Sequence, residues 1–491
     1  MVGTDLTTTA ASRRTWAALA WACAIGAVVV ALHAYLGAPF DADTAYHVAV
    51  GWLLREHGIL RAFPWTPFSW LADHYADKEL FFHLLLAATH GLSWTAAAHL
   101  VGALCGAAAL LAFFFVVRTE RVPLAGGWAL LPLAASPVFV YRFTIVRPHV
   151  LSVALAPLVL WAASRQRLVL LFVASAAYPW AYVAWQMPIG LVAAAEAARW
   201  LSGERPGWKP VVVALAGIFL GVAVHPNSLN LVRLAWFVVG DVLLRNAWAG
   251  RPGFELGREF EPFTVIQWAR WLLAPLAMAG AASLLAWRHR RSRATATAFA
   301  IASLAYGAAT VRTARFAEYF VPFSALALAL AWRPRPRWAL AAFLACAIYS
   351  ARPTVSMLAG LHEETERIPG ALASLLRERI PPGAQIFTCD WGHTGELLLA
   401  LPDRRFIVAL DPTFFYAKDP ERYRLWYRLP REAPPMAAEI IRREFGARFV
   451  ICRWDDRFRR FLNRLATEGG ANTISIADDW SVYDLGDPRS P

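Results

Sequence analysis

The sequence predicts a polytopic α-helical membrane protein with about eleven transmembrane helices, followed by a small C-terminal α/β domain. Three observations predict this fold class. Apolar runs of about 15–24 residues recur through residues 1–350, and about 20 apolar residues span a bilayer. Only 17% of the 491 residues are charged, against about 25% in a soluble protein. Beyond residue 350 the apolar runs shorten and alternate between strand and helix patterns.

The apolar runs indicate the order of the membrane helices. The first run is longer than the apolar core of a signal peptide, so we expect it to be retained as a helix. Two other stretches, 79–91 and 229–250, are expected to lie at the membrane interface instead of crossing it. The predicted spans are 15–36, 94–117, 122–139, 149–164, 168–184, 187–201, 209–224, 264–287, 294–311, 317–332 and 338–350.

The distribution of charge predicts the orientation. If Arg13 and Arg14 lie in the cytoplasm, alternation places every short basic loop on the same side, as the positive-inside rule requires. Those loops contain Arg118 and Arg121, Arg165 and Arg167, Arg205 and Lys209, and the arginines of 288–293 and 333–337. The opposite loops contain the acids Asp41, Asp43, Asp73, Asp77, Glu79, Asp241, Glu255, Glu259, Glu261 and Glu318. An odd number of spans then puts the C-terminal domain outside, on the side of the long first loop, 37–92.

The C-terminal part is expected to comprise an amphipathic linker (351–380) and a soluble α/β domain (381–491) with a partly parallel sheet. Strands are predicted at 384–389, 404–411 and 447–454, with further strands near the C-terminus. No glycine-rich nucleotide-binding motif occurs. The segment 390–416 is rich in Asp, His, Gly and aromatic residues. It is either a turn with a helix cap or a patch over the membrane site that binds the acceptor.

The five cysteines show no CxxC or comparable metal-binding spacing, so we expect no zinc site. Cys389 and Cys452 each end a strand-like run, and they form a disulfide if the domain lies in an oxidising compartment. The sequence leaves that pairing open. The net charge of +13 does not indicate nucleic-acid binding, because the basic residues mark membrane topology and no basic run is interleaved with aromatic residues.

The first outer loop concentrates ionisable groups at the membrane surface, where burying charge is costly. Its candidate catalytic acids are Asp41, Asp43, Asp77 and Glu79. A carboxylate there acts as a general base toward an acceptor, or takes part in proton or ion coupling. The Asp41-x-Asp43 pair also matches what a divalent cation such as Mg²⁺ or Mn²⁺ binds beside a phosphate. Solvated loop charges are the alternative for any single residue.

Basic residues on the same face favour an anionic substrate. Arginine at the outer boundary runs against the positive-inside tendency, and guanidinium groups bind phosphate in a bidentate manner. The alternative for each arginine is contact with lipid headgroups. His47 is equally well explained as an interfacial anchor and His149 as a helix cap. Glu259 and Glu261 are either a further acidic partner or a solvated interfacial turn, and we expect the turn. The predicted substrate-binding residues are His47, Lys78, Arg142, Arg147, His149, Arg312 and Arg315.

This layout resembles the GT-C glycosyltransferases: a cytoplasmic N-terminus, one helix, then a long outer loop that opens on Asp41-x-Asp43 and contains interfacial helices. The superfamily includes oligosaccharyltransferase catalytic subunits, protein O-mannosyltransferases and aminoarabinose transferases. The resemblance covers residues 15–350. It implies Asp41 or Asp43 as base or metal ligand, Asp77 or Glu79 as a second acid, and arginines that hold the donor phosphate. The C-terminal part departs from the pattern, because it has no WWDYG-like motif.

The leading hypothesis is an inverting glycosyltransferase of a bacterial inner membrane. It takes a sugar from a polyprenyl-phosphate or polyprenyl-pyrophosphate donor and transfers it, outside the cytoplasm, to a lipid, glycan or protein acceptor. Two alternatives remain. A transporter or flippase of a lipid-linked glycan requires ionisable residues inside the helices, whereas the acids here cluster at helix ends. A non-catalytic membrane assembly protein predicts that Asp43→Asn leaves function intact.

Overall fold

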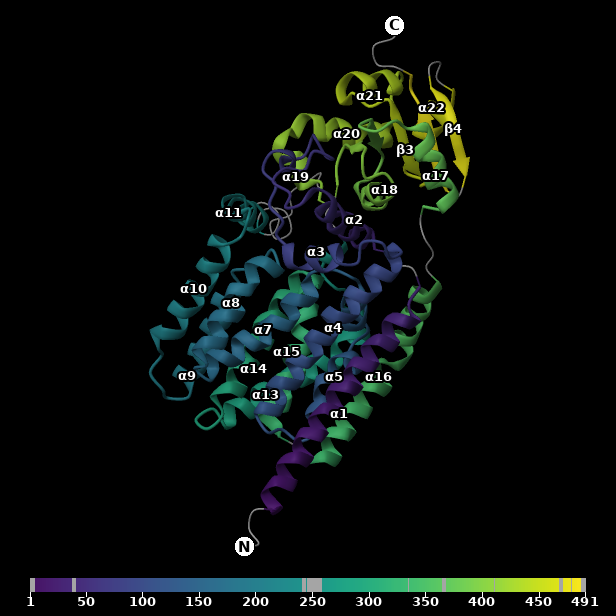
Figure 1. The fold of residues 1–491 in the computed structure, drawn as a ribbon. Helices are drawn as coiled ribbons and strands as arrows, with labels where there is room; N and C mark the ends of the chain where they lie inside the picture. Colours follow the sequence, from purple (N-terminus) through teal and green to yellow (C-terminus); the bar gives the residue numbers. More distant parts are fainter. Residues whose placement is uncertain are drawn as a thin grey trace.

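The computed structural model describes residues 5–37, 41–240, 244, 258–333, 335–363, 368–409, 411–467, 471–477 and 479–486. Helices form a long bundle, and a mixed α/β unit lies at the end opposite the N-terminus (Figure 1). Helices α2 and α3 lie between the bundle and that unit (Figure 1). Asp241 and Glu255, two of the acids predicted on the outer face, lie outside the described residues.

Long helices follow the predicted apolar runs throughout the bundle. Its N-terminal part contains α1 (Asp5–Tyr35), α4 (Trp94–Thr119), α5 (Ala125–Ala135), α6 (Pro137–Thr144), α7 (His149–Ser164), α8 (Leu168–Ala181), α9 (Met187–Leu201), α10 (Trp208–Ala223) and α11 (Ser228–Phe237). Its C-terminal part contains η3 (Arg258–Phe260), α12 (Val265–Gln267), η4 (Trp268–Leu272), α13 (Leu273–Arg288), α14 (Ala294–Arg312), η5 (Ala314–Phe316), α15 (Ala317–Trp332) and α16 (Pro336–Glu363).

Six helices among the described residues are long and apolar enough to cross a membrane, or up to eight if each bent pair is one span. The protein is therefore a multi-pass membrane protein, but the predicted count of eleven spans is not confirmed. Several predicted spans are short: α5 has 11 residues and α8 has 14. At 1.5 Å per residue they extend about 17–21 Å, which is less than the ~30 Å hydrocarbon core.

A sharp bend after α6 creates part of the polar site. Helices α6 and α7 meet at 114°, and residues 145–148 form the break. Ile145 is extended and ends α6, and Pro148 precedes the first residue of α7. Proline disfavours a helical conformation in the residue before it, so the sequence Arg147-Pro148 favours this break. The bend places Arg142 on one helix end and Arg147 in the turn between the two helices.

Basic loops that are far apart in the sequence meet at one end of the bundle. A pocket there is lined by residues that include Arg165, Arg291, Arg293 and Arg333. The buried carboxylate of Glu120 accepts hydrogen bonds from Arg165 (2.6 Å) and Arg333 (3.3 Å). The charge pattern thus grouped these loops correctly on one side of the bundle. That this side faces the cytoplasm stays a prediction.

In its described residues, the first outer loop contains three helical segments. It contains α2 (Ala42–His57), η1 (Trp70–Ala72) and α3 (Leu80–Ala87). Asp41 caps α2, since its side chain accepts from the backbone N–H of Thr44 (3.2 Å). Gly58 ends α2 with a φ of 73°, a conformation that glycine adopts without strain. The cap therefore fixes Asp41 and leaves Asp43 on the first turn.

The C-terminal unit is built on a five-stranded sheet in the order β2-β1-β3-β5-β4. Strands β2, β1 and β3 are parallel, and β5 and β4 are antiparallel to their neighbours. The strands are β1 (Gln385–Thr388), β2 (Arg405–Phe406), β3 (Phe449–Arg453), β4 (Asn472–Ala477) and β5 (Trp480–Asp484). Around them lie α17 (Gly370–Arg379), η6 (Trp391–His393), α18 (Thr394–Ala400), α19 (Thr413–Lys418), α20 (Pro420–Glu432), α21 (Ala437–Phe445) and α22 (Arg459–Thr467).

This unit and the first outer loop share one hydrophobic core. Leu53 and Phe63 of the loop belong to the same buried cluster as Leu397 of α18 and Phe406 of β2. The backbone N–H of Phe406 donates to the carbonyl of Trp65 (2.7 Å), so the loop covers the edge of β2. Strand β2 has only two residues, where a strand over 404–411 was predicted. The loop and the sheet therefore position each other.

The C-terminal unit follows a long helix and contains a disulfide. Helix α16 continues to Glu363, beyond residue 350 where the membrane region was expected to end. A disulfide joins Cys389 and Cys452, at the end of β1 and within β3. It lies directly before Asp390 and Trp391, which begin the segment that faces the bundle.

Candidate active site

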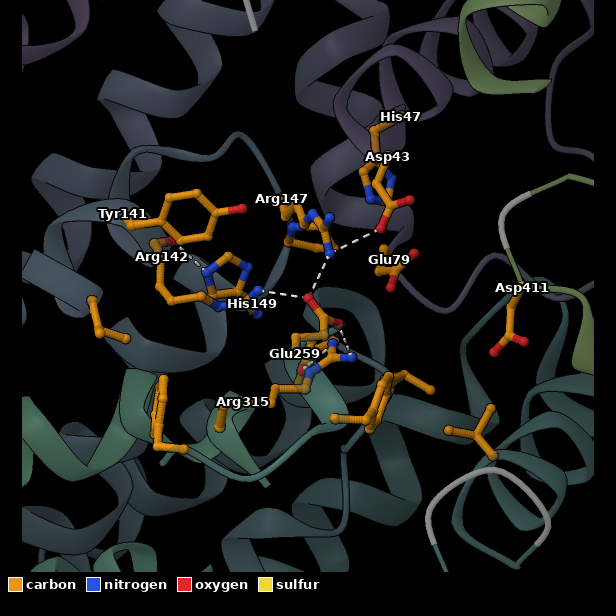
Figure 2. A pocket seen from close by; sticks show the side chains of 18 of the residues that line it. Asp43, His47, Glu79, Tyr141, Arg142, Arg147, His149, Glu259, Arg315 and Asp411 are labelled. Carbon is orange, nitrogen blue, oxygen red and sulfur yellow. Dashed lines mark hydrogen bonds and ion pairs between the residues drawn. The ribbon is translucent and has the colours of Figure 1, made fainter. Parts of the chain in front are cut away.

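A cavity of about 750 Å³ lies between the bundle and the C-terminal unit. One wall is formed by α2 and the start of α3, and another by the α6–α7 bend. Apolar side chains of the bundle, among them Phe263, Trp271 and Met357, line a further part. The cavity is therefore polar along the outer loop and the α6–α7 bend, and apolar along the further part. Figure 2 shows its charged residues converging on the region between Arg147 and Arg315.

Arg147 holds both aspartates of the first loop. Its Nε donates to Asp41 (2.6 Å) and its Nη2 to the other oxygen of the same carboxylate. Its Nη1 lies 2.9 Å from an oxygen of Asp43. Asp41 is thus fully engaged by the helix cap and by a bidentate ion pair. Asp43 lines the cavity with its side chain 22% exposed.

Glu259 is the centre of the arginine cluster. One of its oxygens accepts from Arg142 (2.7 Å) and Arg147 (3.1 Å), and the other from Arg315 (2.8 Å). Figure 2 shows Glu259 between Arg147 and Arg315. The expected solvated turn was wrong for Glu259, because three guanidinium groups from two other parts of the chain surround it. The sequence separations of 56 to 117 residues hide this arrangement.

Buried contacts lock the remaining side of the cluster. Arg142 donates from Nε (2.9 Å) and Nη2 (2.6 Å) to Glu318, which is only 1% exposed. His149 Nε2 lies 2.6 Å from the backbone carbonyl of Arg142. Arg315 Nη2 donates to the hydroxyl of Tyr182 (3.0 Å). Four carboxylates thus face three guanidinium groups, and the arginines are pre-oriented.

Charge and burial shift the pKa values of the acids in different directions. Burial raises the pKa of Asp43 to about 7, and the neighbouring Asp41 adds to this against the charge of Arg147. For Asp41, burial also acts upward, but the charge and hydrogen bonds of Arg147 outweigh it and lower its pKa. In the same way, the three arginines outweigh burial and hold the pKa of Glu259 well below its usual range. Asp43 is the acid with the pKa suited to general-base chemistry near neutral pH.

A second cluster lies beside the first, at the start of α3. Lys78 donates to Glu79 (2.9 Å), and both line the cavity. His47 Nδ1 lies 2.9 Å from His83 Nε2, and His83 Nδ1 lies 2.7 Å from the carboxylate of Asp77. Asp77 and His83 therefore lie behind the cavity wall, and His47 connects them to the cavity. Burial lowers the pKa of His47 well below its ordinary value, so His47 is neutral.

The C-terminal unit supplies the last wall, through Trp391, Asp411, Pro412 and Phe414. The segment 390–416 contains the expected turn with a helix cap and also lines the cavity, while its binding of an acceptor stays a prediction. Asp390 caps η6 by accepting from the N–H of Gly392 (2.9 Å), and Trp391 reaches the cavity. Burial raises the pKa of Asp411, whose side chain accepts from the N–H of Thr413 (2.8 Å). Asp411 was not among the predicted site residues, since its strand-end position resembles an ordinary turn.

Most predicted site residues meet at the cavity. Arg312, at the exposed end of α14, is not among the residues that line it. Asp41 lies one contact behind the wall, through Arg147, and Asp77 lies behind it through His83 and His47. Those that line the cavity are Asp43, His47, Lys78, Glu79, Arg142, Arg147, His149 and Arg315. Their catalytic and binding roles stay predictions.

Solved structures share this architecture. ArnT from Cupriavidus metallidurans bound to undecaprenyl phosphate matches with a TM-score of 0.59 and 12% identity, over 97% of this chain and 99% of that chain. The fold is a GT-C fold. The mycobacterial arabinofuranosyltransferase AftD matches the GT-C fold of this chain with a TM-score of 0.57 and 18% identity. That match covers 95% of this chain, which spans about two fifths of AftD.

These comparisons establish the GT-C fold alone. Identities of 12–18% are too low to carry an activity over to this chain. ArnT in the apo state matches equally well, with a TM-score of 0.57 over 98% of this chain. No protein-family model matches the sequence, and no curated protein matches it.

Proposed function

We propose that this protein is a glycosyltransferase that takes a sugar from a polyprenyl-phosphate or polyprenyl-pyrophosphate donor and transfers it to an acceptor at the outer face of the membrane. The observation that carries the proposal is one cavity that combines an apolar wall with Asp43, Lys78, Arg147 and Arg315. The apolar wall suits a lipid chain and the basic groups suit its phosphate. ArnT, which has the same fold, was solved with undecaprenyl phosphate bound.

The chemistry follows as a single displacement. Asp43 accepts the proton of the acceptor hydroxyl while the hydroxyl oxygen of the acceptor bonds to the anomeric carbon of the sugar. The bond from that carbon to the phosphate oxygen breaks, and the phosphate leaves with the electron pair. One displacement inverts the configuration at the anomeric carbon. Lys78 and Arg315 stabilise the charge that develops on the leaving phosphate.

A divalent cation at Asp41 and Asp43 remains a proposal, and Arg147 competes with it for the two carboxylates. Arg147 contacts both carboxylates, and its positive charge already serves the neutralising role that a cation at this pair would have. Carboxylate ligands of this kind suit Mg²⁺ or Mn²⁺. A cation between these two aspartates requires that Arg147 withdraw.

The test is turnover of a panel of radiolabelled polyprenyl-phosphate and polyprenyl-pyrophosphate sugars by the purified full-length protein. We expect release of sugar from at least one donor, and loss of turnover in Asp43→Asn. Removing a general base lowers rates by about 10²- to 10⁴-fold. Exposed Asp73→Asn is the matched control, since Asp73 pairs with Lys418 away from the cavity.

Two outcomes contradict the proposal. If no donor is cleaved although donors bind, the protein is not this transferase. If labelled donor crosses a proteoliposome membrane intact, the protein is a flippase of lipid-linked glycans. Full turnover in Asp43→Asn rejects the assignment of the base while leaving transfer itself standing.

A further inference from the structure

We propose that His47, Glu79 and His83 bind a divalent transition-metal ion, zinc by ligand type, at the α2–α3 wall of the cavity. One ligand atom from each of these three residues lies within 4.8 Å of the others, and all three residues are buried. Zinc lies about 2.0–2.2 Å from imidazole nitrogens and carboxylate oxygens. Atoms bound to one ion are therefore at most about 4.4 Å apart, so the three ligand atoms need to approach one another by only a few tenths of an ångström at most.

The hydrogen bonding around His83 favours a metal ligand. Its Nδ1 lies 2.7 and 2.8 Å from the two oxygens of Asp77, so that nitrogen carries the proton. The lone pair of His83 is thereby placed on Nε2, which points at His47. Metal-binding histidines commonly donate their other N–H to a carboxylate in this way. Asp77 is a positioning residue in this arrangement.

Two imidazoles and one carboxylate form a His₂Glu set, which is typical of zinc sites that keep an open position. His47 and Glu79 line the cavity, so that position faces the space where the donor phosphate is proposed to lie. The His47–His83 contact of 2.9 Å is otherwise a hydrogen bond between two rings. Metal binding replaces it by moving the proton of His47 to its other nitrogen.

Electrostatics favour a bound cation at this cluster over one at the Asp41–Asp43 pair. Arg147 lies against both aspartates, and a second positive charge between them is repelled. At the proposed site Asp77 and Glu79 contribute two carboxylates, and Lys78 is the cation beside them. The sequence does not indicate the whole cluster, because His47 lies 32 residues before Glu79 and 36 residues before His83.

The experiment measures metal retention by purified full-length protein in detergent. Protein is stripped with EDTA, loaded with ZnCl₂, desalted and analysed by inductively coupled plasma mass spectrometry. We expect about one zinc ion per chain in the wild type, in Asp41→Asn and in the control His90→Ala, and at least about tenfold less in His47→Ala and His83→Ala. Bound Co²⁺ in the wild type should show ligand-field absorption of a tetrahedral site.

Conservative variants keep the test independent of misfolding. Glu79→Gln replaces a proposed ligand and Asp77→Asn the positioning carboxylate, and both preserve shape. Loss of the positioning carboxylate weakens metal affinity by about 10- to 100-fold. Size-exclusion profiles and helical circular dichroism identify variants that fold. Zinc-free wild type, undiminished zinc in both histidine variants, or zinc loss in Asp41→Asn alone overturns the proposal. The proposal does not depend on sugar transfer, because retention is measured without donor or acceptor.

Discussion

At the scale of single residues, two aspartates two positions apart receive different roles from their surroundings. Asp41 caps α2 and is paired with Arg147 through both oxygens, whereas Asp43 reaches the cavity and has a pKa raised to about 7. The sequence motif treats them alike. Asp41 is occupied by the helix cap and by Arg147, whereas Asp43 lines the cavity. Asp43 is therefore the candidate base.

The raised pKa of Asp43 predicts a pH dependence of the proposed transfer. Only the ionised carboxylate accepts a proton, so kcat/KM should rise as pH increases toward about 7 and level off above it. Initial rates across a pH series check this. The Asp43→Glu variant is a useful companion, because it retains a carboxylate and should shift the profile without abolishing it. A flat profile in the acidic range contradicts Asp43 as the base.

At the scale of elements, close packing of two helices in the bundle depends on glycines, which have no side chain. Gly217 and Gly221 are one turn apart on α10 and face α8. A Cβ at Gly217 would lie 2.5 Å from the carbonyl oxygen of Phe172, which real structures do not tolerate. Small residues spaced four apart are the usual means of close helix approach in membranes.

Gly217→Ala should therefore destabilise the bundle. Overpacking costs about 1–3 kcal/mol, and the thermal unfolding midpoint of the purified protein should fall measurably. Gly280→Ala is the matched control, since nothing lies within 4 Å of a Cβ at that position of α13. Equal midpoints for the two variants would show that α8 and α10 are not packed as described.

At the scale of the whole molecule, orientation decides which compartment the cavity faces. Basic loops meet at one end of the bundle, while the acidic loop and the C-terminal unit meet at the other (Figure 1). Cytoplasmic loops are enriched in Lys and Arg, so the cavity end should be extracytoplasmic. The Cys389–Cys452 disulfide agrees with this, because disulfides persist in oxidising compartments.

Reporter fusions test the orientation. Alkaline phosphatase fused after Pro491 should be active and green fluorescent protein at the same point should be dark, which places the C-terminus outside the cytoplasm. Fusions after Arg121, in a basic loop, should show the reverse. The opposite result at Pro491 would put the cavity in the cytoplasm and remove the topological support for an outer-face transferase.

The sequence by itself determined a multi-pass helical membrane region, the grouping of the basic loops and the place of the acidic loop, because apolar length and charge are local properties. It also indicated Asp43, Lys78 and the arginines of the α6–α7 bend, since charge at a membrane boundary is conspicuous. Only the tertiary structure decided that Glu259 joins three arginines, that Asp411 faces the cavity, and that His47 meets His83. These contacts join residues 36 to more than 100 positions apart, and the helix bends and the shared loop–sheet core that create them depend on packing, which no local pattern encodes.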